Sequence, residues 1–203
     1  FGWSFKSNST SNQPSASQLR IVYILPHNSP QYIPHIMSEP KLNKVAEITL
    51  LFWLMKIVAT TLGETLGDYL SMTLNLGYAI GIVITLLFFL TVLTIQILTN
   101  RYTPLFYWLV IIATTTLGTE ISDFLDRSLH LGYTMGSLVL FSGLILTLVL
   151  WKKRFKTLQV YPIADKNKEI YYWTAILFSN SLGTAFGDYL SDVIGLSYLN
   201  GAM

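Results

Sequence analysis

The sequence predicts an all-α integral membrane protein that is built from tandem two-helix repeats. Three observations support this fold class. The composition is apolar, since 52% of the 203 residues are hydrophobic and only 12% are charged, whereas about 25% of residues are charged in an ordinary soluble domain. Five apolar segments are each long enough to cross a hydrocarbon core of about 30 Å. One sequence pattern recurs three times, and an internal repeat takes precedence over other assignments.

The repeat is defined by four columns that keep fixed offsets from a central glycine, which is Gly63, Gly118 or Gly183. A Trp lies ten residues before this glycine, an Asp five residues after it, a Tyr fifteen after it and a second glycine eighteen after it. These columns contain Trp53, Trp108 and Trp173; Asp68, Asp123 and Asp188; Tyr78, Tyr133 and Tyr198; and Gly81, Gly136 and Gly201. Each copy is expected to form one helical hairpin, so all copies point the same way.

The chain divides into an N-terminal extension and three copies of the repeat. Residues 1–40 contain many Ser, Asn, Gln and Pro residues, and we expect a disordered or non-native extension with Met37 as the natural start. The three copies occupy residues 41–100, 101–165 and 166–203. The alignment places the start of a sixth helix near Leu199, so we expect the third copy to be truncated.

The expected helices follow the apolar segments in order. The first ends in the acidic part of the repeat, and the second is almost wholly apolar. A turn at residues 100–104 precedes the third helix, and a loop rich in Lys separates the fourth from the fifth. The expected helices span residues 48–70, 79–98, 105–125, 133–151 and 170–190.

The distribution of Lys and Arg predicts the orientation in the membrane. These residues concentrate before the first helix and between the copies, whereas the loops inside the copies hold only Arg127. By the positive-inside rule, the N-terminus and the loops between copies are cytoplasmic. We therefore expect a multi-pass protein of the inner (plasma) membrane whose repeats are related by an axis along the membrane normal.

The first, third and fifth helices each carry one stripe of small and oxygen-bearing side chains. Residues at i, i+4, i+7 and i+8 share one face of an α-helix. The stripes read Lys56, Thr60, Glu64, Gly67, Asp68 and Ser71; Ile111, Thr115, Thr119, Ser122, Asp123 and Asp126; and Ile176, Asn180, Thr184, Gly187, Asp188 and Ser191. The second and fourth helices lack such a stripe, so we expect these odd-numbered helices around a central polar axis and the even-numbered helices towards lipid.

The chemistry of the stripes predicts a path for a cation or a proton. A carboxylate near the bilayer centre costs about 2.5–3.5 kcal/mol, so such groups usually face the interior of the bundle. Oxygen ligands suit hard cations or protons, and the chain has no Cys. The candidate ligands or proton carriers are Glu64, Asp68, Glu120, Asp123 and Asp188, with Thr60, Thr115 and Asn180 as supporting oxygens and Lys56 as a counter-ion of Glu64 or Asp68.

Structural roles for the same residues stay open. An Asp near a helix end can bond its own loop, and Gly and Thr can serve close packing of membrane helices. Glu120 lies one position off its stripe and can face a neighbouring helix, and Arg127 and His130 are expected to be solvated loop residues. Two functions therefore compete: a small-cation transporter or exchanger, and a non-transporting scaffold or partner-binding subunit whose acids hold helices together.

Other function classes are disfavoured. No His or Cys lies within the expected helices to form a nucleophile–base pair, so we do not expect an enzyme. The net charge of +2 and the lack of a basic patch interleaved with aromatics give no support for nucleic-acid binding. We expect no organic cofactor. The expected partners are the lipid bilayer and a small inorganic cation or proton.

Several short segments carry a resemblance to a known family: residues 52–53, 56–57, 59–61, 63–64 and 67–70, with Leu-Gly-Tyr at 76–78 and 131–133. In these segments the chain resembles a family of bacterial inner-membrane proteins that is built from a repeat of unknown function, usually in four copies. The resemblance covers about residues 41–203 and implies an eight-helix, all-α protein, of which this chain carries two and a half repeats. The third copy departs from the first, since Thr184 stands where the first copy has Glu64.

A looser likeness concerns cation/proton exchangers that use a Glu-x-Gly-Asp motif in repeated helices. Here the motif reads Glu64-x-x-Gly67-Asp68 and is one residue longer. This likeness adds a little weight to cation transport and implies no further residue.

Overall fold

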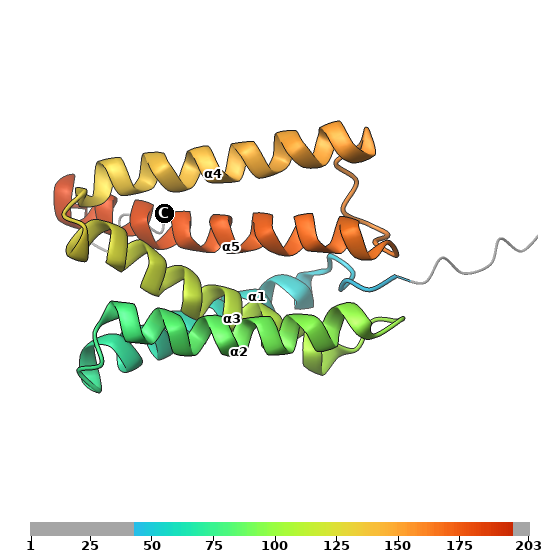
Figure 1. Cartoon of the computed structure of the whole chain (residues 1–203), viewed down its shortest axis with the longest axis horizontal. Coiled ribbons are helices and arrows are strands. Elements are labelled where there is room, and N and C mark those ends of the chain that lie inside the picture. Colours follow the sequence, from blue (N-terminus) through green and yellow to red (C-terminus); the bar gives the residue numbers. More distant parts are fainter. Residues whose placement is uncertain (1–42, 197–203) are drawn as a thin grey trace, which may run out of the picture. The chain divides into compact units, whose positions relative to one another are not determined.

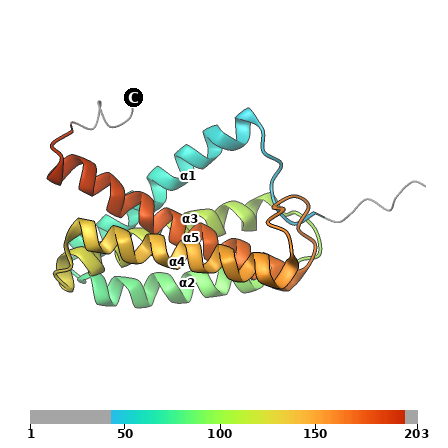
Figure 2. The same cartoon turned by 90° about the horizontal axis from the view of Figure 1, so that it is seen from above.

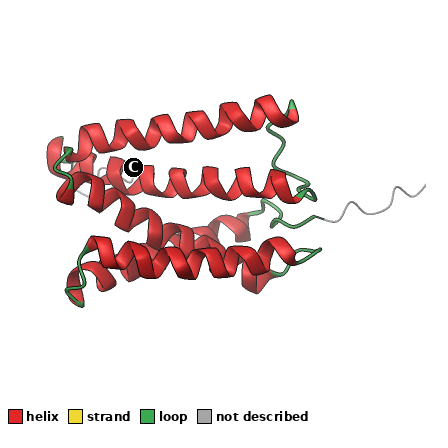
Figure 3. Ribbon diagram, in the orientation of Figure 1, coloured by secondary structure: helices red, strands yellow, loops and turns green. Residues whose placement is uncertain are grey.

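The computed structural model describes residues 43–196, and their regular secondary structure is helical throughout. Five long helices follow one another, joined by short loops, as Figure 3 shows. They are α1 (Leu50–Asp68), α2 (Tyr78–Leu98), α3 (Pro104–Asp123), α4 (Gly132–Phe155) and α5 (Lys166–Asp188). The predicted all-α fold is confirmed, with helix ends within a few residues of those expected. The expected N-terminal extension, the start at Met37, the residues Tyr198 and Gly201 and the start of a sixth helix lie outside the described residues.

A turn of π-helix follows each of α1, α3 and α5, and the sequence analysis did not anticipate it. These turns are η1 (Tyr69–Thr73), η2 (Phe124–Ser128) and η3 (Tyr189–Val193). Each begins directly after the Asp of the repeat, so Asp68, Asp123 and Asp188 all end a regular α-helix at the same place in the copy. Single turns of π-helix inside or after α-helices occur frequently at functional sites.

The connection after each π-turn keeps the same backbone conformation in all three copies. Asn75, His130 and Gly195 occupy equivalent positions and have φ angles of 54°, 55° and 75°. Gly77 and Gly132 follow two residues after Asn75 and His130 with φ angles of 75° and 71°. This left-handed region costs little for Gly and is tolerated by Asn and His. His130, expected to be merely solvated, therefore occupies a position that shapes the turn.

Helix α3 lies at the centre of the described bundle. It packs against α1, α2 and α5, and α4 packs mainly against α5. In Figure 1, α2 and α4 lie at the lower and upper edges, with α3 and α5 between them; Figure 2 shows the same helices from above. The even helices are peripheral, as expected. Helix α1 is equally exposed, however, so α3 alone takes the central place that we had expected the odd helices to share.

The odd helices approach one another through the central glycine of the repeat. A Cβ added to Gly63 of α1 would lie 2.7 Å from Cβ of Thr115 and 2.8 Å from the carbonyl oxygen of Ile112, both on α3. A Cβ added to Gly118 of α3 would lie 3.0 Å from the backbone nitrogen of Ser181 on α5. Small residues let membrane helices pack at short distance. The equivalent Gly183 of α5 has no described neighbour within 4 Å.

Four of the described helical segments are long and apolar enough to cross a membrane. They are Leu50–Thr73, Tyr78–Leu98, Pro104–Ser128 and Gly132–Phe155. Large apolar side chains cover their outer surfaces, for example Leu87, which is 61% exposed. Helix α5 is as long as the others but less apolar, because its first turn is charged and its middle carries Ser179, Asn180 and Ser181. The chain is therefore a multi-pass membrane protein with a more polar fifth helix.

A buried ion pair joins three segments at the end of the bundle where α1 begins. The ammonium of Lys44 donates to Oε2 of Glu169 at 2.6 Å and to the carbonyl oxygen of Ile97 at 2.8 Å, and both charged side chains are almost fully buried. The amide of Gln96 donates to the carbonyl oxygen of Lys44 at 3.0 Å and to Oε1 of Glu169 at 3.3 Å. This cluster ties the segment before α1 to the end of α2 and the start of α5.

Candidate functional site

The stripe of α3 lies buried, with α1 on one side and α5 on the other. Thr115, Thr119 and Asp123 are 5%, 2% and 2% exposed, although all three carry polar groups. Thr115 packs against Gly63 of α1 and accepts a hydrogen bond from Asn180 of α5. The stripe of α3 therefore lies between α1 and α5 and contacts residues of both helices.

A hydrogen-bonded chain crosses the bundle at the level of Asn180. The ammonium of Lys56 on α1 donates to Oδ1 of Asn180 at 3.1 Å. The amide nitrogen of Asn180 donates to the hydroxyl oxygens of Thr114 and Thr115 at 3.1 Å and 3.0 Å. Both hydroxyls donate in turn to the carbonyl oxygen of Ile111. This chain links all three odd helices through neutral oxygens and one positive charge.

The partner of Lys56 differs from the one expected. We expected Lys56 to pair with Glu64 or Asp68, but its ammonium lies on the amide oxygen of Asn180. Glu64 lies two turns further along the same helix, which corresponds to about 12 Å of helix rise. Within residues 43–196 the ammonium contacts Asn180 of α5 and forms no ion pair with either carboxylate of its own helix, so packing between helices decides the pairing.

A second set of polar contacts lies nearer to the π-turns. The hydroxyls of Thr119 on α3 and Thr184 on α5 share a hydrogen bond of 3.2 Å. The guanidinium of Arg127 lies 3.7 Å from Asp123 and 3.7 Å from Asp188, and it donates to the hydroxyl of Tyr78 at 3.3 Å. Arg127, expected to be only solvated, therefore bridges two of the predicted acids, and that expectation was wrong. Its position one turn after Asp123 was the only sequence signal for this role.

The two acids of α1 remain free of such contacts. Glu64 is exposed and Asp68 is half-buried, and within residues 43–196 neither forms an ion pair or a side-chain hydrogen bond. Thr60 donates to the carbonyl oxygens of Lys56 and Ile57 of its own helix. The α1 stripe thus offers carboxylate oxygens that are free to bind a ligand.

Glu120 does not join the other predicted residues. Its side chain is fully buried against α2, where its Oε2 forms a short hydrogen bond with the hydroxyl of Thr85. Glu120 therefore faces the neighbouring helix α2, which is the alternative left open for it, and among the described residues it makes no hydrogen bond with another predicted acid. The cause is its register, since it lies one residue away from the stripe that carries Thr119 and Asp123.

The acids do not gather as they would around a metal ion. Among the described residues, no three His, Asp or Glu side chains lie close enough to hold a metal. The arrangement has carboxylates, hydroxyls and an amide interleaved with the positive charges of Lys56 and Arg127.

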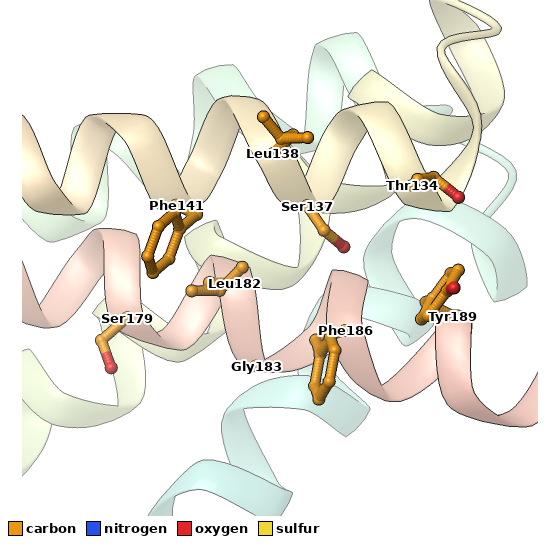
Figure 4. Close-up of a pocket in the computed structure, with 9 residues that line it drawn as sticks. All are labelled: Thr134, Ser137, Leu138, Phe141, Ser179, Leu182, Gly183, Phe186 and Tyr189. Atoms are coloured by element: carbon orange, nitrogen blue, oxygen red, sulfur yellow. The ribbon is translucent and has the colours of Figure 1, made fainter.

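A separate groove lies between α4 and α5. Its volume is about 650 Å³, and the side chains of Phe141, Leu182 and Phe186 line it together with Gly183, as Figure 4 shows. None of the predicted site residues lines this groove, and its surface is almost wholly apolar. It does not supply the oxygen ligands that a cation requires.

Comparison with known proteins identifies the repeat. A family model described as Repeat of Unknown Function (DUF347) matches residues 51–102, 106–157 and 171–203. No curated protein and no solved structure matches the chain. The three matched segments together cover more than half of the sequence.

Proposed function

The chain belongs to the Repeat of Unknown Function (DUF347) family, and we propose that it is a transporter or exchanger of a small cation. The observation that supports this proposal is the row of polar side chains between α1, α3 and α5. It runs from Lys56 and Asn180 past Thr119 and Thr184 to Asp123 and Asp188. These groups lie within or beside apolar helices, where charged residues are costly and usually mark the path of an ion or proton.

The free acids of α1 provide the proposed entry point. Asp68 lies within electrostatic range of Arg127, Glu64 and Asp188. Arg127 neutralises Asp123 and Asp188 through ion pairs of 3.7 Å, and a cation at this level would compete with it for the same oxygens. In this proposal the cation is singly charged or a proton, since the described acids do not converge as metal ligands.

The orientation in the membrane belongs to the same proposal. The exposed basic residues Lys152, Lys153 and Arg154 lie at the end of α4, in the loop region between copies. The positive-inside rule assigns this end to the cytoplasm. The N-terminus is then cytoplasmic, the π-turns point outward, and the membrane is the inner (plasma) membrane.

A second candidate function is that of a membrane scaffold or partner-binding subunit. The observation in its favour is that most polar groups of the row already bond one another across helices. Asn180, Thr115, Thr119 and Thr184 all make such contacts, and interhelical hydrogen bonds of this kind hold membrane helices together. Under this alternative the acids have structural roles and no ion passes.

Replacing Asp68 with Asn is expected to abolish cation flux while leaving the fold intact. Asp68 has no described ion pair or side-chain hydrogen bond, so its loss removes a ligand without breaking a contact. The measurement is the pH inside liposomes that contain the protein, recorded while Na⁺, K⁺, Ca²⁺, Mg²⁺ or Mn²⁺ is added outside. The wild type should show a pH change with at least one cation, and Asp68→Asn should not.

The matched control is Glu47→Gln, which removes an exposed carboxylate in the segment just before α1. It should transport like the wild type. If the wild type responds to no cation and an Asp68→Asn protein merely unfolds at a lower temperature, transport is excluded and the scaffold function is favoured.

A further inference from the structure

Two carboxyl groups of the α3–η2 segment are buried without a complete set of partners. Glu120 is 0% exposed and Asp126 is 7% exposed. Within the described part of the chain, Oε1 of Glu120 and both carboxyl oxygens of Asp126 have no hydrogen-bond partner. Asp126 was not among the predicted ligands, and neither group belongs to the row between α1, α3 and α5. Both therefore require an explanation of their own.

The second glycine of the repeat makes room for each of these carboxyl groups. A Cβ added to Gly81 of α2 would collide with the carboxyl group of Glu120. A Cβ added to Gly136 of α4 would collide with that of Asp126. Gly81 and Gly136 occupy the same column of the repeat, so two copies use the same position to seat a buried carboxyl group of α3 or η2.

The positive charge near Asp126, on Arg127, compensates a negative charge on that carboxyl group only in part. Arg127, its neighbour in η2, directs its guanidinium to Asp123 and Asp188 instead. Asp188 of α5 faces Asp126 with a like charge, and Tyr78 of α2 and Tyr133 of α4 lie beside Arg127. An ionised carboxylate without a partner is very costly in an apolar interior, whereas a neutral carboxylic acid is much less so.

The hydrogen-bond geometry at Glu120 leads to the same conclusion. A Thr hydroxyl carries one proton and two lone pairs. Thr85 lies 3.0 Å from the carbonyl oxygen of Gly81, to which it donates. The same hydroxyl also donates to Oε2 of Glu120, so its single proton serves two acceptors, whereas a protonated Glu120 allows both contacts to be full hydrogen bonds. Asp123, on the same helix, is the titratable group that faces Glu120.

We propose that Glu120 and Asp126 are two proton-binding sites, each formed by a carboxyl group seated on the second glycine of a repeat. Each binds one proton at neutral pH and is a neutral carboxylic acid in the folded protein. The sites face different even helices, α2 for Glu120 and α4 for Asp126. Proton binding here goes beyond the proposed cation flux and does not depend on it.

Infrared spectroscopy of the full chain in liposomes tests the proposal directly. Protonated carboxyl groups absorb in a carbonyl region that is separate from the amide bands and shifts in D₂O. The wild type at neutral pH should show one such band from each of the two sites. Glu120→Gln should remove one band and Asp126→Asn the other. Glu47→Gln is the matched control and should remove none, because Glu47 is exposed.

The absence of any carboxylic-acid band in the wild type at neutral pH would overturn the proposal. Bands that persist in both Glu120→Gln and Asp126→Asn would overturn it as well. If either variant fails to fold, isotopically labelled aspartate in the wild-type protein replaces it, because only the Asp126 band should then shift. The readout requires no transport, so its result and that of the flux assay are independent.

Discussion

Replacing Lys44 with Met is expected to lower the free energy of unfolding by about 3–5 kcal/mol. Lys44 and Glu169 form an ion pair of 2.6 Å, and their side chains are 3% and 0% exposed. Without the ammonium group, the carboxylate of Glu169 stays buried with only the Gln96 amide and the Trp173 indole as donors. An uncompensated buried charge is more costly than the net gain of the original pair.

Thermal unfolding in detergent, followed by circular dichroism, measures this effect. For a chain of this size the loss corresponds to a fall in Tm on the order of 10 °C. Lys152→Met, at an exposed lysine at the end of α4, is the control and should change stability by no more than about 0.5 kcal/mol. The double substitution Lys44→Met with Glu169→Met should recover much of the loss. A Lys44→Met protein as stable as the control would contradict a structural role for this ion pair.

Replacing Gly63 with Ala is expected to destabilise the bundle by about 1–3 kcal/mol, because the added methyl group overpacks the contact between α1 and α3. The new Cβ would meet the backbone oxygen of Ile112 at 2.8 Å and Cβ of Thr115 at 2.7 Å. Backbone atoms cannot move aside without shifting a helix, so the added methyl group weakens the packing of α1 against α3.

The chain offers a matched control at the same column of the repeat. Gly183→Ala adds the same methyl group at the equivalent position of α5, where no described atom lies within 4 Å. Because Ala also favours the helix over Gly by about 1 kcal/mol, Gly183→Ala should be neutral or stabilising. The measurement is the Tm of each variant, and only Gly63→Ala should have a lower Tm than the wild type. Equal destabilisation by both would show that the glycine column acts through helix propensity or local conformation and not through helix contact.

The repeat in the sequence predicted most of the fold. Fixed offsets of Trp, Gly and Asp indicated parallel copies, and the approach of α1 to α3 and of α3 to α5 follows directly from the glycine column. The pattern did not predict which odd helix lies at the centre. That depends on how each copy packs on the next, and α3 is the odd helix with a neighbouring copy on both sides in the described chain.

The candidate site was only partly predictable for the same reason. Helix periodicity grouped Thr115, Asp123 and Asn180 correctly, since residues of one face share a direction. It could not choose the partners across helices: Lys56 bonds Asn180, and Arg127 joins Asp123 to Asp188. The π-turns after each Asp, which bring Arg127 and Asp126 into the bundle, have no periodic signature in the sequence.

The proposed cation path requires that the stripe of α1 faces water inside the protein and not lipid. The chain contains no Cys, so a single introduced thiol reports on its own surroundings. Glu64→Cys places one on the stripe. Leu62→Cys places one two residues away on the lipid-facing side of the same helix, where Leu62 is 47% exposed.

The measurement is the rate at which a charged, water-soluble thiol reagent modifies each position in the membrane. The reactive species is the thiolate, which forms readily only in water. We predict that Glu64→Cys is modified several-fold faster than Leu62→Cys, and that the cation which gives a pH response in liposomes slows the modification of Glu64→Cys. Equal rates at the two positions, or faster modification at Leu62→Cys, would contradict a water-accessible path between the odd helices.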